Sequence, residues 1–239
     1  MRFLPLALLV ALCTPMLASA AGSCTSQDFD TAVAPALPPG WTSSVDTGAA
    51  STTGWITRSV GYDDTSPNAA WLDDNNDYAD ISLYSAVYGV GAEGSPSITF
   101  RHSYVLWAPD TSPLYAGAYS GATLEVSING GAFTDLINAG GSFSTGGYNA
   151  HLDANAENPI DQPPSGRAVW SGDSGGFITS TAVMPAAALG ATVQFRWRLG
   201  TEGGSRSYDM HSGWWIDSVQ YLTLGDIIFA DGFGDPCTE

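Results

Sequence analysis

Residues 192–199 read TVQFRWRL, and apolar side chains stand at every second position of this segment. A period of two places neighbouring side chains on opposite faces of an extended chain, so the pattern predicts a β-strand with one buried face. The segments 97–107 and 122–128 alternate in the same way, and His102 falls on the apolar face of the first. The three segments together predict a fold built on strands.

Further strands are expected at 54–58, 79–84, 177–183 and 214–222, and no window carries a convincing helical stripe. Residues 129–131, NGG, tolerate positive φ and predict a hairpin turn. About nine or ten short strands joined by loops rich in Gly, Ser, Asn and Pro are typical of a sandwich. The expected fold class is therefore all-β, an antiparallel two-sheet β-sandwich of jelly-roll type. The long segment 139–176 is expected to form surface loops.

The last expected strand contains a change of phase. Trp214 and Ile216 share one parity, whereas Val219 and Tyr221 share the other. One extra residue in the strand returns both pairs to the same face. We therefore predict a β-bulge at 217–218.

The charge of the chain excludes two classes of partner. Of its 239 residues 24 are acidic and seven are basic, which gives a formal net charge of −17, and all seven basic residues are arginine. Without basic clusters the chain cannot bind nucleic acid by neutralising phosphates, and it is not attracted to an anionic membrane surface. The hydrophobic fraction of 44% is enough for a buried core.

The first twenty residues have the pattern of a secretory signal peptide. Arg2 precedes an apolar run at 3–12, and Ala18-Ser19-Ala20 has the small-x-small form of a cleavage site. We therefore divide the chain into a signal peptide (1–20), a sandwich domain (21–222) and a short acidic tail (223–239). The mature protein, cleaved near Ala20, is predicted to be secreted and to lack a membrane span.

Two cysteines remain after the signal peptide is removed. Cys24 and Cys237 stand at opposite ends of the mature chain. Two thiols in an oxidising compartment indicate one disulfide that joins the ends, with two free terminal thiols as the alternative.

The segment 172–176, GDSGG, equals the nucleophile motif of trypsin-like serine proteases, in which a histidine acts as base. His102 is the best candidate base for Ser174, but it precedes the serine by only 72 residues (174 − 102), about half the separation in that family. Short runs of Gly, Ser and Asp are also ordinary turns. We expect a turn here, and His102 inside the core.

Acidic side chains suggest two sites for a structural Ca²⁺, which prefers hard oxygen ligands. If the first and last strands are neighbours, Asp28 and Asp30 converge on Asp217. A second candidate site consists of Asp73, Asn75 and Asp77, which stand at alternating positions. The alternative is that these acids cap turns or face solvent.

No pair of acids stands out as a glycosidase pair, although such pairing is spatial and many acids are available. Aromatic side chains stack on sugar rings, and an aromatic platform for glycans is a further candidate. The residues considered for it are Trp71, Trp107, Trp214 and Tyr208.

Four motifs frame the mature chain: Cys24-x4-Phe29-Asp30, Pro38-Pro39-Gly40-Trp41, Gly213-Trp214-Trp215-Ile216-Asp217-Ser218-Val219 and Cys237. They resemble the framing motifs of MAM-type domains, and more closely those of MAM-like jelly-roll domains of bacterial secreted proteins. The resemblance covers roughly residues 28–222. It implies a jelly roll with adhesion or accessory-binding roles and no hydrolase activity. Family-type metal binding is implied at Asp30 and Asp217, whereas Ser218 stands where the family usually has a second Asp.

The sequence thus predicts a secreted, non-catalytic module that binds an extracellular protein or glycan. One disulfide and a structural Ca²⁺ are expected to brace it. The alternative is a secreted hydrolase, either of serine type at GDSGG or with a pair of carboxylates.

Overall fold

The computed structural model describes residues 23–59, 65, 67–74, 77–108, 117–203 and 212–223. This part of the chain forms sixteen strands and one 3-10 turn, η1 (Ala186–Ala188). None of its helical segments is long and apolar enough to cross a membrane. The predicted signal peptide and nearly all of the predicted tail lie outside the described residues.

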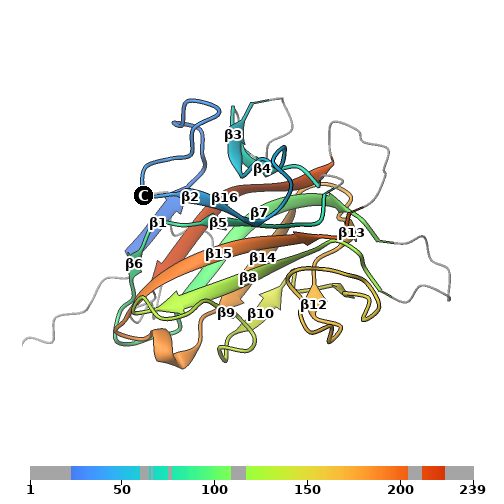
Figure 1. Ribbon diagram of the computed structural model, residues 1–239. Helices are drawn as coiled ribbons and strands as arrows, with labels where there is room; N and C mark the ends of the chain where they lie inside the picture. Colours follow the sequence, from blue (N-terminus) through green and yellow to red (C-terminus); the bar gives the residue numbers. More distant parts are fainter. Residues whose placement is uncertain are drawn as a thin grey trace, which may run out of the picture.

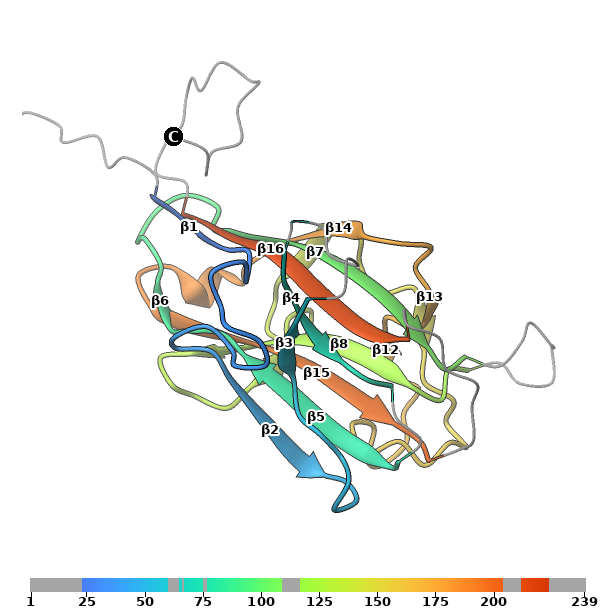
Figure 2. The same ribbon diagram turned by 90° about the horizontal axis from the view of Figure 1, so that it is seen from above.

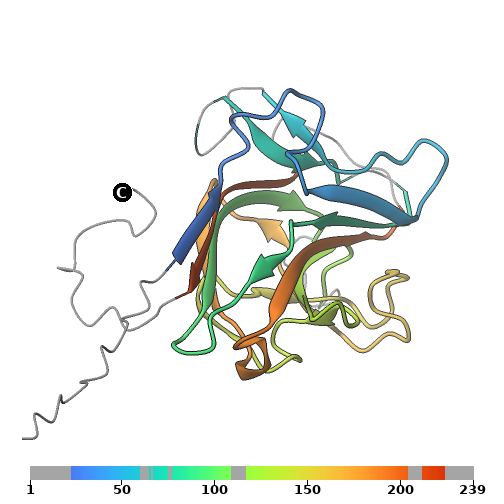
Figure 3. The same cartoon turned by 90° about the vertical axis from the view of Figure 1, so that its left-hand side faces the viewer.

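The larger sheet has eight strands, all paired antiparallel. Its main path runs β10 (Ser142–Thr145), β14 (Ile178–Val183), β7 (Ser97–Leu106), β16 (Gly213–Thr223), β4 (Ala69–Leu72) and β3 (Ile56–Arg58). Beside this path, β1 (Ser23–Gln27) pairs with β16, and β13 (Gly172–Asp173) pairs with β7. Figure 3 shows β1, in blue, alongside the dark red β16.

The smaller sheet has six strands, of which five lie in the order β2 (Thr42–Thr47), β5 (Ala79–Tyr84), β15 (Thr192–Thr201), β8 (Gly121–Ile128) and β9 (Thr134–Asp135). The short β6 (Tyr88–Gly89) also pairs with β15. A separate two-stranded ribbon joins β11 (Ala150–His151) to β12 (Ala168–Val169).

The chain passes repeatedly from one sheet to the other, so neighbouring strands in a sheet are mostly distant in sequence. Figures 1 and 2 show the two layers, one with β2, β5, β15 and β8 and the other with β16, β7 and β14. Sheet-crossing connections between antiparallel strands are typical of a jelly roll. The predicted fold class, an antiparallel two-sheet β-sandwich, is confirmed.

The alternating segments of the sequence supply the core between the sheets. Every apolar side chain on the predicted inner face of β15, from Val193 to Leu199, is buried, and β7 behaves in the same way. In β8, Leu124 and Val126 are buried and Ile128 is partly buried. Large aromatic rings fill much of the space; Phe100 packs edge-on against Trp197 and Trp170, with ring centroids 5.7 and 5.9 Å apart. The predicted turn is also present, because Asn129 and Gly130 have positive φ after β8.

The bulge in β16 is confirmed. The pairing of β16 with β7 shifts register between Asp217 and Gln220, and Ser218 has φ of 48°. The shift returns Val219 and Tyr221 to the core, where they are 0% and 4% exposed.

The segment 139–176 differs from its prediction as a surface loop. It forms β10 to β13, and its residues Val169 and Trp170 are completely buried. We call residues 150–170 the strap. Leu152, Ile160 and Val169 of the strap form a second apolar cluster with Ala118, apart from the main core. The apolar residues of the strap follow neither the period of a strand nor that of a helix. The sequence pattern therefore did not predict that this segment is partly buried.

Candidate functional site

One row of side chains crosses the outer face of the smaller sheet, from β2 to β9. The alternation that sends Phe195 and Trp197 into the core sends Arg196 to this outer face. Strand register then sets its cross-strand neighbours. The row is Thr42, Tyr84, Arg196, Glu125 and Asp135, each directly opposite the next.

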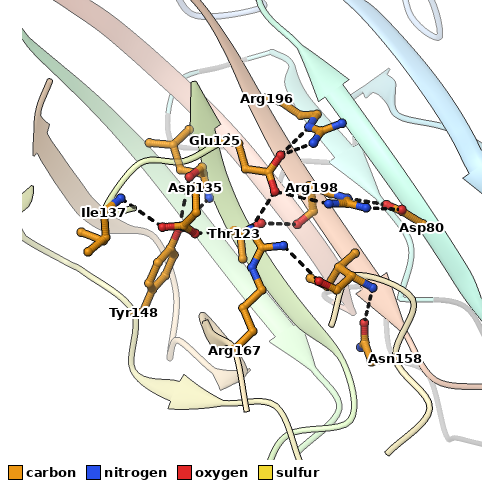
Figure 4. Close-up of polar contacts among 12 residues, drawn as sticks. Asp80, Thr123, Glu125, Asp135, Ile137, Tyr148, Asn158, Arg167, Arg196 and Arg198 are labelled. Carbon is orange, nitrogen blue, oxygen red and sulfur yellow. Dashed lines mark hydrogen bonds and ion pairs between the residues drawn. The ribbon is translucent and has the colours of Figure 1, made fainter. Parts of the chain in front are cut away.

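Glu125 lies at the centre of a network of arginines (Figure 4). Its carboxylate accepts hydrogen bonds from Arg196 Nε and Arg167 Nη2, both at 2.7 Å, and lies 3.4 Å from Arg198 Nη1. Glu125 is only 2% exposed. Burial raises its pKa, but the positive charges of the three arginines outweigh burial and hold the pKa below its usual value. Glu125 is therefore a charged, fully engaged carboxylate.

The charges of this network balance. Arg198 makes a two-pronged pair with Asp80, at 2.8 Å from Nε and 2.6 Å from Nη2. Burial alone lowers the pKa of Arg198, but the hydrogen bonds and charge of Asp80 raise it above its usual value. Arg167 also lies 3.4 Å from Asp135. Three arginines thus face three carboxylates, which leaves neither an acid in excess for catalysis nor a cation in excess for an anion.

The strap covers one half of the row. Arg167 reaches from the strap to Glu125 and also donates to Ile160 O at 3.1 Å. Asn158 Nδ2 donates to Gly200 O on β15 at 2.9 Å and to Tyr119 O at 2.8 Å. Figure 4 shows Arg167 and Asn158 lying against the sheet from the strap side. The Glu125–Asp135 half of the row is therefore buried.

The other half of the row is open. Thr42 is exposed, and Tyr84, Arg196 and Phe133 are partly exposed. The rings of Tyr84 and Phe133 meet edge-on at 5.3 Å with an angle of 62°, and the Arg196 guanidinium lies 4.7 Å from the Phe133 centroid. Tyr84 Oη and Ser44 Oγ share a hydrogen bond of 3.1 Å. We call Thr42, Ser44, Tyr84, Phe133 and Arg196 the open half. The sequence analysis did not predict the open half, because its residues are distant in sequence and become neighbours only through the pairing of the strands.

His102 and Ser174 do not form a catalytic pair. His102 is completely buried; its Nε2 bonds Ser180 Oγ at 2.7 Å, and its Nδ1 accepts from Trp214 Nε1 at 3.2 Å. Ser174 Oγ instead accepts from Tyr104 N and donates to Gly176 O, both at 2.9 Å. Both ring nitrogens of His102 are engaged elsewhere. The GDSGG segment begins as β13 beside β7 and then bends at 175–176, so the predicted turn occupies only its second part.

The burial of His102 makes stability depend on pH. Burial, with a smaller contribution from Arg101, lowers its pKa to about 3, whereas in the unfolded chain the pKa is about 6.5. Between these values the unfolded chain binds the proton and the folded chain does not, so stability falls as pH falls through this window. We expect His102 to account for about 2–3 kcal/mol of lost unfolding free energy between pH 7 and pH 4.5.

The measurement is urea unfolding at both pH values, for the parent and for His102→Gln. The glutamine keeps a donor and an acceptor but does not titrate. Its loss of stability between the two pH values should be smaller than that of the parent by about 2–3 kcal/mol. Equal losses would show that other groups cause the dependence.

The acids predicted near the chain ends lie at the junction of β1 and β16. Asp30 Oδ1 accepts from Asn68 N at 3.0 Å, and the buried Asp217 accepts from Thr65 N at 2.9 Å. Asp28 is exposed and accepts from the backbone N–H of Asp30 at 3.1 Å. Asp30 and Asp217 thus bind the same short segment, and backbone N–H groups occupy oxygens of all three carboxylates.

The donor chemistry of these acids suits Ca²⁺, but their placement does not complete a site. Within the described residues no group of three or more His, Cys, Asp or Glu side chains is arranged to hold a metal ion. In the second candidate set, Asn75 lies outside the described residues. Burial raises the pKa of Asp73, and Asp77 accepts from Thr52 Oγ1 at 2.8 Å.

Asp74, which the sequence did not single out, is the buried acid of this acidic segment. It is 2% exposed, and it accepts from Trp107 N at 2.9 Å and from Ser120 Oγ at 3.0 Å. These bonds tie the segment to the ends of β7 and β8, so Asp74 has a structural role.

The predicted disulfide and the predicted aromatic platform each include a residue outside the described part of the chain. Cys24 is half-buried in β1, while Cys237 lies outside the described residues, so their pairing stays a prediction. The aromatic platform is wrong in one member, because Trp214 is completely buried in the core. Tyr208 lies outside the described residues. Trp71 is half-buried beneath Arg58, whose guanidinium lies 4.1 Å from its ring centroid.

No family model matches the chain, and no curated protein matches it. Among solved structures, the chain is similar to the K2, K1 and K3 cleaved adhesin domains of Lys-gingipain, the K1 and K3 structures being from Porphyromonas gingivalis W83. Identity is 14% in each case, and the matches cover 83%, 85% and 84% of this chain and 99% of each domain. The TM-scores are 0.43, 0.42 and 0.41. The two antiparallel sheets of this chain identify the sandwich, and the MAM-like resemblance stays an expectation.

Proposed function

We propose that this protein is a secreted, non-catalytic β-sandwich module that binds an extracellular protein or glycan. The observation that carries the proposal is the row on the outer face of the smaller sheet. Its buried half is a neutral, fully paired network around Glu125, and its open half presents aromatic, guanidinium and hydroxyl groups. Such a surface suits recognition, because rigid planar groups bind with little loss of conformational freedom.

The rival function, a serine hydrolase, lacks support at its nucleophile. Ser174 donates its hydroxyl to a backbone carbonyl, and His102 is bonded to other partners inside the core. A serine is a weak nucleophile unless a base takes its proton, and the candidate base His102 is bonded to Ser180 and Trp214 and not to Ser174.

Two measurements test the proposal together. The folded protein, with Ser174→Ala as control, is treated with a fluorophosphonate probe and mapped by peptide mass spectrometry. The labelled protein is also titrated onto extracellular matrix material that has been separated into protein and polysaccharide fractions. We expect no probe on Ser174 and saturable binding to one of the fractions. Labelled Ser174, or no saturable binding to either fraction, contradicts the proposal.

As a separate element, we propose that Ca²⁺ stabilises the junction of the chain ends. The support is that Asp30 accepts from Asn68 N and Asp217 accepts from Thr65 N, which brings carboxylates from both ends of the chain to the junction of β1 and β16. A cation that binds only the folded chain raises its stability by mass action. We expect millimolar Ca²⁺ to raise Tm and EDTA to reverse the rise, whereas Asp30→Asn should abolish it. If Ca²⁺ leaves Tm unchanged, the Ca²⁺ site is contradicted. The proposal that the protein binds an extracellular protein or glycan is not affected by that result.

A further inference from the structure

The geometry points to the open half as a binding site for an uncharged oligosaccharide. This inference rests on the proposed function and names both its surface and its ligand class. It starts from five neighbouring side chains that the fold brings together from β2, β5, β15 and the turn before β9.

The open half combines the two kinds of group that a sugar ring needs. The C–H faces of a pyranose pack on aromatic rings, and its hydroxyls need planar donors and hydroxyl partners at the ring edge. The rings of Tyr84 and Phe133 meet edge-on at 5.3 Å, and the Arg196 guanidinium lies over one face of the Phe133 ring, 4.7 Å from its centroid. Ser44 and Thr42 add hydroxyls next to Tyr84.

Hydrogen bonds to neighbouring side chains fix Arg196 and Tyr84 in place. Glu125 holds Arg196 through Nε at 2.7 Å and through a second bond from Nη2, while Ser44 holds the phenol of Tyr84. The strap in turn holds Glu125 through Arg167. Side chains that are already ordered lose little rotamer freedom when a ligand binds, which favours affinity. The strap thus acts as a support for the site.

The local charge selects the class of ligand. The carboxylates of Glu125, Asp80 and Asp135 balance the guanidinium groups of Arg167, Arg196 and Arg198. An acidic glycan finds no uncompensated cation at this face, and a basic peptide finds its acids buried and already paired. Hydroxyl groups of an uncharged sugar are compatible with this arrangement, because they accept from guanidinium N–H groups and donate to hydroxyl oxygens.

Within the described residues, a second cluster of arginine and aromatic side chains lies on the larger sheet. On the larger sheet Arg58 lies 4.1 Å from the Trp71 centroid and 5.6 Å from that of Trp215. The indole N–H of Trp71 donates to Ser212 O at 3.1 Å. This cluster has its indole donor engaged within the protein, so Trp71→Ala is a matched control for the loss of a half-buried aromatic ring.

The test is affinity electrophoresis of the full mature chain in gels that contain uncharged soluble polysaccharides, namely a β-glucan, a xylan, a mannan and a galactan. Calorimetry follows with oligosaccharides of the best polysaccharide. We expect retardation by at least one of them. Tyr84→Ala and Phe133→Ala should each raise Kd by about tenfold or more, and Trp71→Ala should leave it within about twofold. A thermal melt of each variant confirms that it is folded.

Three results overturn the inference. The first is that no uncharged polysaccharide retards the protein, or that an acidic polysaccharide does so more strongly. The second is that folded Tyr84→Ala and Phe133→Ala variants bind as the parent does. The third is that Trp71→Ala abolishes binding. If the protein still binds a matrix protein saturably in any of these cases, the proposed function stands and only this site and ligand class fail.

Discussion

Replacing Glu125 with Ala is expected to lower the free energy of unfolding by about 3–5 kcal/mol at pH 7. The side chain is 3% exposed and interacts with three guanidinium groups whose side chains are 15–20% exposed. Taking the carboxylate away leaves three positive charges facing two carboxylates, Asp80 and Asp135, and removes the carboxylate that pairs with Arg196, in a place where water solvates the charges poorly. Guanidinium chloride unfolding measures the loss.

The matched control is Glu157→Ala. Glu157 is an exposed glutamate of the strap, and its replacement should change stability by no more than about 0.5 kcal/mol. Similar losses for the two variants would show that the network contributes no specific stability.

Limited trypsin digestion adds a local readout of the same substitution. The chain has no lysine, so trypsin cuts only after its seven arginines. Loss of the bond between Arg167 and Glu125 should open the strap and make cleavage after Arg167 faster than in the parent. If Arg167 stays protected in Glu125→Ala, the apolar cluster of Leu152, Ile160 and Val169 holds the strap by itself.

Trp170→Ala is expected to cost about 3–5 kcal/mol. The indole is completely buried, its Nε1 donates to Gly146 O at 2.9 Å, and its ring lies 4.7 Å from that of Tyr148 and 5.9 Å from that of Phe100. The substitution removes a large buried surface and leaves a cavity. It also removes the indole N–H that donates to the carbonyl of Gly146. Chemical denaturation again gives the value.

Trp107→Ala is the control for Trp170. Trp107 is a half-buried tryptophan at the end of β7, and its ring contacts Tyr119 at 4.5 Å. Because less of its surface leaves water on folding, its loss should cost about half as much as that of Trp170. A comparable cost for both would mean that Trp170 is less important to the core than its burial suggests.

The strands, the core faces and the bulge could be predicted from sequence, because each is encoded locally. Alternation over eight to ten residues is enough to place Phe195 inside and Arg196 outside, and a change of phase is enough to place the bulge at Asp217. The same local logic placed His102 in the core, and its complete burial confirms this.

The row and the strap could not be predicted, because neither is local. Arg196 and Glu125 are 71 residues apart and Arg167 and Glu125 are 42 apart, so only strand register and the path of the strap bring them together. The sequence alone does not indicate which of these residues pair with one another. The acids near the chain ends show a related difficulty. Their proximity was predicted, but the sequence pattern did not indicate that Asp30 accepts from Asn68 N and Asp217 from Thr65 N.

The position of β16 has a consequence for how the protein folds. It is the last described strand in the chain, yet it lies inside the larger sheet, where it pairs with β7 along one edge and with β4 and β1 along the other. Until β16 joins, β7 and β4 have no common neighbour and the aromatic core is open on one side. The rate of folding should therefore be limited by the closure of very long loops. During synthesis the sandwich should stay incomplete until β16 has emerged, because the two halves of the larger sheet meet only through this strand.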